Sequence, residues 1–177
     1  MPEFWARRSG QDVIGHLGSP VLPTWCKLAA PNMSVRAVLF LCTGNYYRSR
    51  FAEGLFNHLA GQLRLGWRAD SCGLALGHAE TANVGPIAIY TLEAFKVRSI
   101  PIAEPMRYPK ATTLADLTSA DLIIALKEAE HRVLMRRHFP DWEHRITYWH
   151  VHDLDQAPPH FALAEIETLV RDLIARL

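Results

Sequence analysis

The strongest constraint on the fold is an alternation of strand-like and helix-like segments that runs from Val35 to the last residue. Short apolar or β-rich runs predict strands at residues 35–41, 66–74, 121–126 and 145–151. Segments with helical spacing of apolar residues follow them, at residues 48–63, 86–95, 127–139 and 162–177. Strands that alternate with helices require right-handed crossovers. The sequence therefore predicts an α/β fold, with a parallel sheet of four strands and helices on both faces.

The alternation leaves out residues 1–33, which contain four prolines and three glycines and have neither helical nor strand periodicity. We expect these residues to form a poorly ordered leader and residues 34–177 to form one domain, which a chain of 177 residues readily supports. Met33 lies two residues before the first predicted strand. A start site placed too far upstream therefore explains the leader as well as a real extension does.

Charge and cysteine content restrict the partners and the compartment. The formal net charge is only +1, which gives no general attraction to nucleic acid, and no apolar run reaches membrane-spanning length. Three cysteines at scattered positions favour a reducing compartment over a disulfide framework. We therefore expect a cytoplasmic protein with no nucleic-acid or membrane partner and with chemistry at a single thiol. The oligomeric state is left open.

The chemistry is predicted at the junction between the first strand and the first helix. Cys42 ends the strand and Arg48 begins the helix. Ligands of parallel α/β sheets bind at the carboxyl ends of strands, and a helix N-terminus favours both a phosphate and a thiolate. Arg48 offers a planar fork for two oxygens of a tetrahedral anion. Gly44 and Asn45 suit the positive φ that such a loop needs.

The stretch VLFLCTGNYYRSRFAEGLF resembles the active-site segment of the low-molecular-weight protein tyrosine phosphatases, whose pattern is Cys-x-Gly-Asn-x-x-Arg-Ser. The resemblance implies that Cys42 is a nucleophile that becomes phosphorylated and that Arg48 binds phosphate. It also implies that Asn45 holds the loop shape and that Ser49 hydrogen-bonds the cysteine sulfur. The expected phosphate-binding residues are Thr43, Gly44, Asn45, Tyr46, Tyr47, Arg48 and Ser49.

The resemblance further implies a general acid, an aspartate in an Asp-Pro pair after the last strand. Asp153 falls at that place, but Leu154 replaces the proline, and Asp155 is an alternative acid two residues later. We favour Asp153, because the strand ends near His152 and the loop that follows overhangs the end of the first strand.

Other histidines and cysteines have simpler interpretations. His150, His152 and Asp153 suggest a metal site, but they equally suit the polar end of a strand. A phosphocysteine mechanism needs neither a metal nor an organic cofactor, so we expect none. His131 opens a helix, where it is expected at the surface or in a cap hydrogen bond. Cys26 and Cys72 are expected to be structural thiols.

The leading hypothesis is a phosphomonoester hydrolase that acts on a phosphotyrosine protein or a small phosphomonoester. A phosphate-binding or phosphoprotein-binding module with weak turnover is the alternative, because Tyr46 and Tyr47 are bulky and Leu154 replaces the proline. The related thioredoxin-coupled arsenate reductases share the loop pattern. They need further cysteines, but none follows Cys72, and Tyr47 stands where a second cysteine is common.

Overall fold

The computed structural model describes residues 35–76, 83–151 and 158–177, which all belong to one compact unit, Met33–Leu177. The predicted leader, residues 1–33, lies outside the described residues. Among the described residues, no helix is both long enough and apolar enough to span a membrane.

Four parallel strands form one sheet in the order β2-β1-β3-β4, as predicted. The strands are β1 (Arg36–Cys42), β2 (Trp67–Gly73), β3 (Leu122–Ala125) and β4 (Thr147–Tyr148). The central strand β1 pairs with β2 along its whole length, ending at Cys42 opposite Gly73. The edge strand β4 is much shorter than the predicted 145–151, because it pairs with β3 at only two positions.

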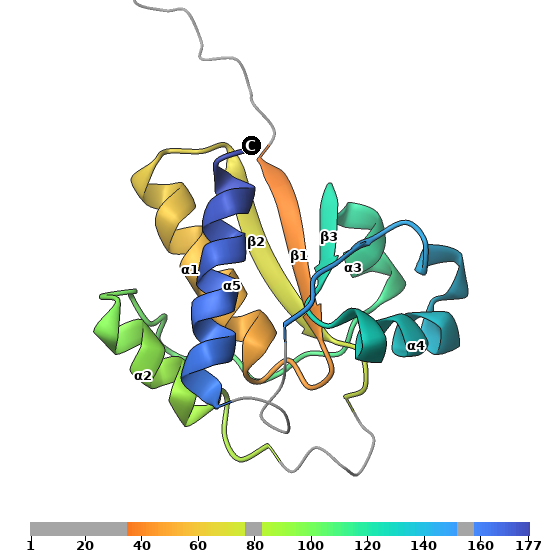
Figure 1. The fold of residues 1–177 in the computed structure, drawn as a ribbon, viewed down its shortest axis with the longest axis horizontal. Coiled ribbons are helices and arrows are strands. Elements are labelled where there is room, and N and C mark those ends of the chain that lie inside the picture. Colours follow the sequence, from red (N-terminus) through yellow and green to blue (C-terminus); the bar gives the residue numbers. More distant parts are fainter. Residues whose placement is uncertain (1–34, 77–82, 152–157) are drawn as a thin grey trace, which may run out of the picture. The chain divides into compact units, whose positions relative to one another are not determined.

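In the described part of the chain, five helices and one 3₁₀ turn lie between or after the strands (Figure 1). They are α1 (Arg48–Gln62), α2 (Ile89–Val97), α3 (Leu114–Ser119), α4 (Glu128–His138), η2 (Pro140–Trp142) and α5 (Pro159–Ile174). Helix α3 was not predicted because it has six residues, too few to show a period, although Thr113 and Asp116 form a capping box at its start. Helix α5 begins three residues earlier than predicted, with Pro159 in its first turn.

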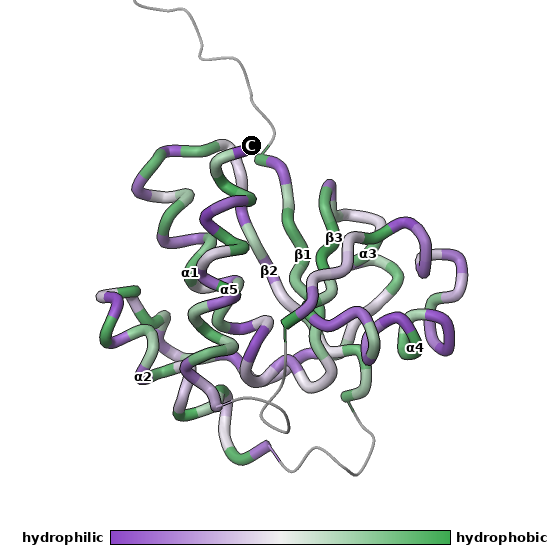
Figure 2. The backbone as a smooth tube through the Cα atoms, in the orientation of Figure 1, coloured by the Kyte–Doolittle hydropathy of each residue, from purple (hydrophilic) through white to green (hydrophobic). Residues whose placement is uncertain are grey.

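Alternating side chains of β1 supply both cores of the sheet. Val38 and Phe40 belong to the cluster with α1 and α5, and Phe40 packs edge-to-face on Phe56 of α1. Leu39 and Leu41 belong to the second cluster, with residues of α3 and α4. Figure 1 shows α1, α2 and α5 on one side of the sheet and α3 and α4 on the other. In Figure 2 β1 is mostly hydrophobic in colour, as burial on both faces requires, whereas α4 is largely hydrophilic.

The parallel arrangement places the carboxyl ends of β1, β2 and β3 at one edge of the sheet. Backbone hydrogen bonds continue the pairing just beyond these ends: Leu74 N donates to Cys42 O at 2.9 Å, and Leu126 N donates to Leu41 O at 3.0 Å. The loop after Cys42 is therefore fixed to its neighbours on both sides. This edge carries the candidate site.

Candidate active site

Cys42 is the last residue of β1, and its thiol is buried. Its Sγ lies 3.0 Å from Oγ of Ser49, which is in the first turn of α1. The N-terminus of α1 has no side-chain cap and no acidic residue in its first turn. The N–H groups at this end of the helix carry a partial positive charge, which favours an anion or a thiolate in the preceding loop.

The loop between Cys42 and α1 turns at Asn45, whose φ of 46° is left-handed, as predicted. Its buried amide makes four hydrogen bonds: Nδ2 donates to Ser49 Oγ (3.1 Å) and Ser71 Oγ (2.8 Å). Its Oδ1 accepts from Lys110 N (3.0 Å) and from Arg107 (2.9 Å). The prediction that Gly44 also has a positive φ is wrong, since Gly85 is the only described glycine with one. One left-handed residue, held by its side chain, makes the turn.

Arg48 is buried, with only 2% of its side chain exposed, and it reaches across the loop to α4. Its guanidinium lies 3.4 Å from Oε2 of Glu130. Glu130 also accepts a hydrogen bond from Thr43 Oγ1 and lies 3.8 Å from Nζ of Lys127. Sequence reasoning missed Glu130, because an acidic residue at the start of a helix is ordinary. The carboxylate holds Thr43 and Arg48 at the edge of the predicted phosphate loop, residues 43–48.

His131 is fully buried, so the expectation of a surface position is wrong. Its Nδ1 accepts a hydrogen bond from the backbone N–H of Lys127, the N-cap residue of α4, and its Nε2 lies 3.4 Å from Thr43 Oγ1. The expectation of a hydrogen bond at the helix start is thus correct. Burial lowers the pKa of His131 well below its usual value, and the positive charges of Arg48 and Lys127 lower this pKa further.

The two tyrosines of the loop link it to neighbouring segments of the chain. Tyr47 is buried in the core, and its hydroxyl donates to Pro159 O in the first turn of α5 at 2.8 Å. Tyr46 donates to Val84 O at 2.6 Å. Thr91 of α2 donates to the carbonyl of Tyr47 at 3.4 Å. The bulk of Tyr47 therefore packs against α2 and α5.

Gly73, at the end of β2, is a second residue that sequence reasoning missed. A Cβ atom at this position would lie 3.0 Å from Thr43 O and 3.1 Å from Asn45 N. The neighbouring strand thus approaches the loop backbone as closely as a glycine allows. The signal was present in the sequence, as a glycine at the carboxyl end of a predicted strand next to the first.

A third missed group lies behind the loop: Glu53 of α1, Ser71 of β2 and Arg107. Arg107 belongs to the irregular segment between α2 and α3, and no periodicity or motif marks it in the sequence.

Cys72, two residues before Leu74, is the structural thiol that was predicted, since it is buried and burial raises its pKa to about 12.

The predicted acids, Asp153 and Asp155, lie outside the described residues, as do His152 and Leu154. The described segment before them ends at Val151, whose N–H donates to Leu126 O at 2.9 Å at the edge of the sheet that carries the candidate site. Within residues 35–76, 83–151 and 158–177, no group of three or more His, Cys, Asp or Glu side chains is arranged to hold a metal ion.

The loop geometry agrees with what comparison of the whole sequence finds. Residues 37–177 match the family described as low molecular weight phosphotyrosine protein phosphatase. The chain belongs to this family. The resemblance read from the loop alone is thereby confirmed, and membership assigns the chain to the cysteine-based phosphatases. No curated protein gave a significant match.

Several solved structures share the fold. A low molecular weight protein tyrosine phosphatase from T. tengcongensis is 27% identical with a TM-score of 0.67, covering 80% of this chain and 99% of that one. YfkJ from Bacillus subtilis is 25% identical with a TM-score of 0.68, covering 81% and 94%. The YwlE arginine phosphatase from Geobacillus stearothermophilus, at 19% identity, a TM-score of 0.63 and coverage of 80% and 92%, shares the fold alone.

Proposed function

We propose that the protein hydrolyses phosphomonoesters through a phosphocysteine intermediate on Cys42. The observation that carries the proposal is the buried Cys42 sulfur, 3.0 Å from the Ser49 hydroxyl and beside the uncapped N-terminus of α1. A hydroxyl donor and the helix dipole both stabilise a thiolate, which is the nucleophilic form of cysteine. Arg48 and the backbone amides of residues 43–48 bind the three non-bridging oxygens of the phosphate.

The reaction has two steps. The Cys42 thiolate attacks phosphorus in line, forming an S–P bond while the P–O ester bond breaks, and the departing oxygen takes a proton from Asp153. A water molecule then attacks phosphorus and gives a proton to Asp153, while the S–P bond breaks and the thiolate returns. We assign the acid to Asp153 because it follows Val151, which is hydrogen-bonded at the active edge of the sheet. No metal or organic cofactor takes part in this scheme.

The substrate class is a phosphotyrosine protein or a small phosphomonoester in the cytoplasm, with no nucleic-acid or membrane partner. Because one fold relative is named as an arginine phosphatase, a substrate panel should contain a phosphoarginine peptide beside phosphotyrosine and phosphoserine peptides. We assign residues 34–177 to the catalytic domain, and the comparison with the family supports this boundary.

Arsenate reduction is disfavoured, because Cys72 is buried, its pKa is raised to about 12, and no cysteine follows it in the sequence. The binding-module alternative rests on Tyr46, Tyr47 and Leu154. The loop itself retains the cysteine, the arginine and the serine that turnover needs.

The test is hydrolysis of an aryl phosphate by the wild type and by Cys42→Ser, with and without a chelator. We expect chelator-independent turnover that the serine variant loses, because a serine hydroxyl is a far weaker nucleophile than a thiolate. The variant should still bind vanadate, since Arg48 and the loop amides remain. Retained turnover in Cys42→Ser contradicts the covalent mechanism, and a wild type that binds phosphopeptide without turnover supports the binding module.

A further inference from the structure

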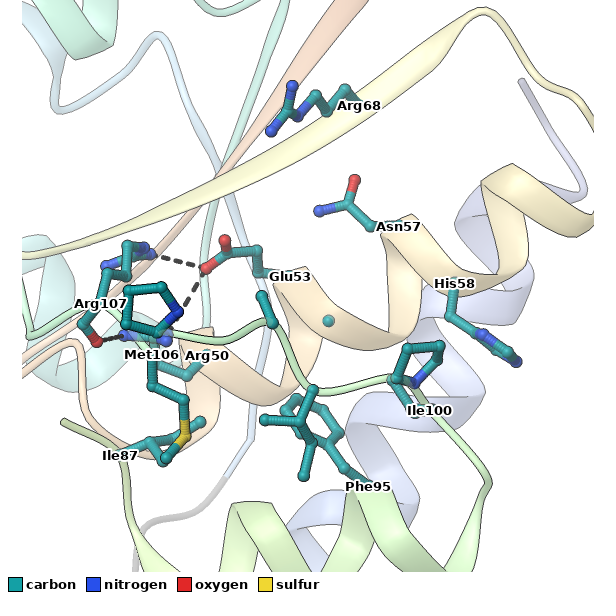
Figure 3. A pocket seen from close by; sticks show the side chains of 15 residues that line it. Arg50, Glu53, Asn57, His58, Arg68, Ile87, Phe95, Ile100, Met106 and Arg107 are labelled. Atoms are coloured by element: carbon teal, nitrogen blue, oxygen red, sulfur yellow. Dashed lines mark hydrogen bonds and ion pairs between the residues drawn. The ribbon is translucent and has the colours of Figure 1, made fainter.

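Arg107 stands between the phosphate loop and a pocket of about 500 Å³ behind it. Figure 3 shows its guanidinium beside Glu53 at one end of this pocket, where Arg50 also approaches Glu53. Ile87, Phe95 and Met106 line the apolar part of the pocket, and no residue from Cys42 to Ser49 lines it. About a third of the Arg107 side chain is exposed, so this residue reaches the loop from the solvent side of the pocket.

The guanidinium of Arg107 makes several hydrogen bonds at once. One nitrogen donates to Asn45 Oδ1 at 2.9 Å. The other donates to Glu53 Oε2 at 2.7 Å and, at 3.0 Å each, to the backbone oxygen and the hydroxyl oxygen of Ser71. Only the planar fork of an arginine has donors spaced to serve these acceptors together.

These bonds determine which way the Asn45 amide faces. Its Oδ1 has two donors directed at it, Arg107 and the backbone N–H of Lys110. A flipped amide would place its N–H groups against these two donors, so the N–H groups of Arg107 and Lys110 and those of the amide would all lose their acceptors. The amide nitrogen must therefore face Ser49 and Ser71, and it donates to both hydroxyl oxygens.

The direction of the Asn45 bonds in turn determines where the Ser49 proton goes. A serine hydroxyl has one proton to donate, and the Ser49 oxygen already accepts from Asn45. Its remaining hydrogen-bonding partner is the Cys42 sulfur at 3.0 Å, so the Ser49 proton points at that sulfur. A donor directed at the sulfur stabilises the thiolate over the thiol.

The hydrogen bonds of Ser71 are consistent with the same orientation of the Asn45 amide. Ser71 Oγ accepts from both Asn45 and Arg107, and it donates to Glu53 Oε2 at 2.6 Å. Glu53 thus takes the proton that Ser71 would otherwise direct at Asn45, and it also balances the charge of Arg107. The donors from Arg107 through Asn45 and Ser49 therefore point toward the Cys42 sulfur, while Ser71 donates to Glu53.

We propose that Arg107 is a positioning residue of the phosphatase reaction, which orients the Asn45 amide from behind the loop so that Ser49 donates its proton to the Cys42 sulfur. The proposal rests on the proposed role of Cys42 as the nucleophile. Arg107 touches neither substrate nor sulfur and acts only through Asn45 and Ser49.

The experiment compares wild type with Arg107→Ala and Arg107→Lys in steady-state kinetics and in iodoacetate inactivation of Cys42 across pH. We expect kcat/KM of Arg107→Ala to fall about 10- to 100-fold. This factor is what the loss of one hydrogen bond from a charged group amounts to when its free energy is expressed as a rate. We expect the pH midpoint of inactivation to rise by about one unit, which corresponds to a tenfold weaker preference for the thiolate. Arg107→Lys should recover part of the rate, because one ammonium cannot serve all the acceptors.

Chemical rescue and a matched control complete the design. Deleting the Arg107 side chain opens a space that joins the pocket, so guanidinium ion added at low concentration should restore part of the rate of Arg107→Ala and lower the inactivation midpoint again. Arg68→Ala is the control, since Arg68 is an exposed arginine that lines the same pocket, and it should behave as wild type.

The outcomes separate the possible roles. A purely structural role for Arg107 would lower Tm while the inactivation midpoint stays in place, and that result overturns the proposal. So does a wild-type midpoint in a folded, less active Arg107→Ala protein. Alkylation of the Cys42 peptide by iodoacetate can also be followed by mass spectrometry, without any substrate, so its pH midpoint tests the orientation of Ser49 even if the wild type hydrolyses no phosphomonoester. That outcome contradicts the proposed function instead.

Discussion

Replacing His131 by asparagine should make the free energy of unfolding less sensitive to acid. His131 is fully buried, its Nδ1 accepts from Lys127 N, and burial lowers its pKa well below the usual value. The folded state therefore keeps this histidine neutral, whereas the unfolded chain protonates it below about pH 6.5. Because the unfolded state then binds more protons, the free energy of unfolding falls as the pH drops. Asparagine keeps a hydrogen-bond acceptor near the position of Nδ1 but does not titrate.

The size of the effect follows from the one additional proton that the unfolded state binds at His131. The wild type should lose about 1 kcal/mol of unfolding free energy relative to His131→Asn between pH 6.5 and pH 5.5, the interval in which the unfolded histidine becomes mostly protonated. Below that interval the relative loss should be about 1.4 kcal/mol per pH unit, down to the pKa of the folded state. Above about pH 7.5 the difference between the two proteins should be constant, because neither state protonates the residue.

Urea unfolding from about pH 8 to about pH 5 measures these values. At high pH the constant difference in unfolding free energy between the two proteins gives the packing cost of the substitution. The change of this difference with pH then gives the contribution of the proton bound at His131. Parallel stability curves for the two proteins over the whole range would refute the reasoning, because they would show that the folded and unfolded states protonate His131 alike.

Three further predictions concern the loop and its surroundings. Gly73→Ala should lower kcat/KM about tenfold without unfolding the protein. The reason is that the added Cβ displaces the loop backbone at Thr43 O and Asn45 N by a few tenths of an ångström. Unchanged steady-state kinetics of this variant would show that the loop moves aside without cost. Iodoacetate near pH 8 should modify Cys42 and spare the buried Cys72, whose pKa is raised to about 12, and mass spectrometry of the digest would reveal the opposite pattern. Asp153→Asn should lower kcat roughly 10²- to 10⁴-fold with a poor leaving group and much less with a good one, while Asp155→Asn changes little; the reverse pattern would transfer the acid to Asp155.

Most of the fold could be predicted because the signals are local. The sequence itself shows the apolar runs of β1 and β3 and the helical spacing of apolar residues in α1 and α5. Because strands and helices alternate, a parallel sheet is the topology that fits them. The misses have physical reasons. Helix α3 is too short to show a period, and the two-residue strand β4 is limited by its partner β3 rather than by its own sequence.

The residues of the candidate site differ in the same respect, since some belong to a local motif and others do not. The residues from Cys42 to Ser49 form one motif, so the sequence indicated them together. Glu130 and Arg107 reach the loop from 82 and 62 residues away, and nothing local distinguishes them from ordinary surface charges. The burial of His131 depends on which face of α4 meets the sheet, and a helix with only His131 and Met135 buried gives a weak apolar pattern.

The most direct test of the central claim is rapid acid quenching during turnover of an aryl phosphate with a good leaving group. In such a reaction the second step limits the rate, so the phenolate should appear in a burst of about one equivalent per protein. Digestion and mass spectrometry of the quenched protein should then place a phosphate on the peptide that contains Cys42. Sustained turnover with no burst and no phosphate on Cys42 would contradict the phosphocysteine mechanism.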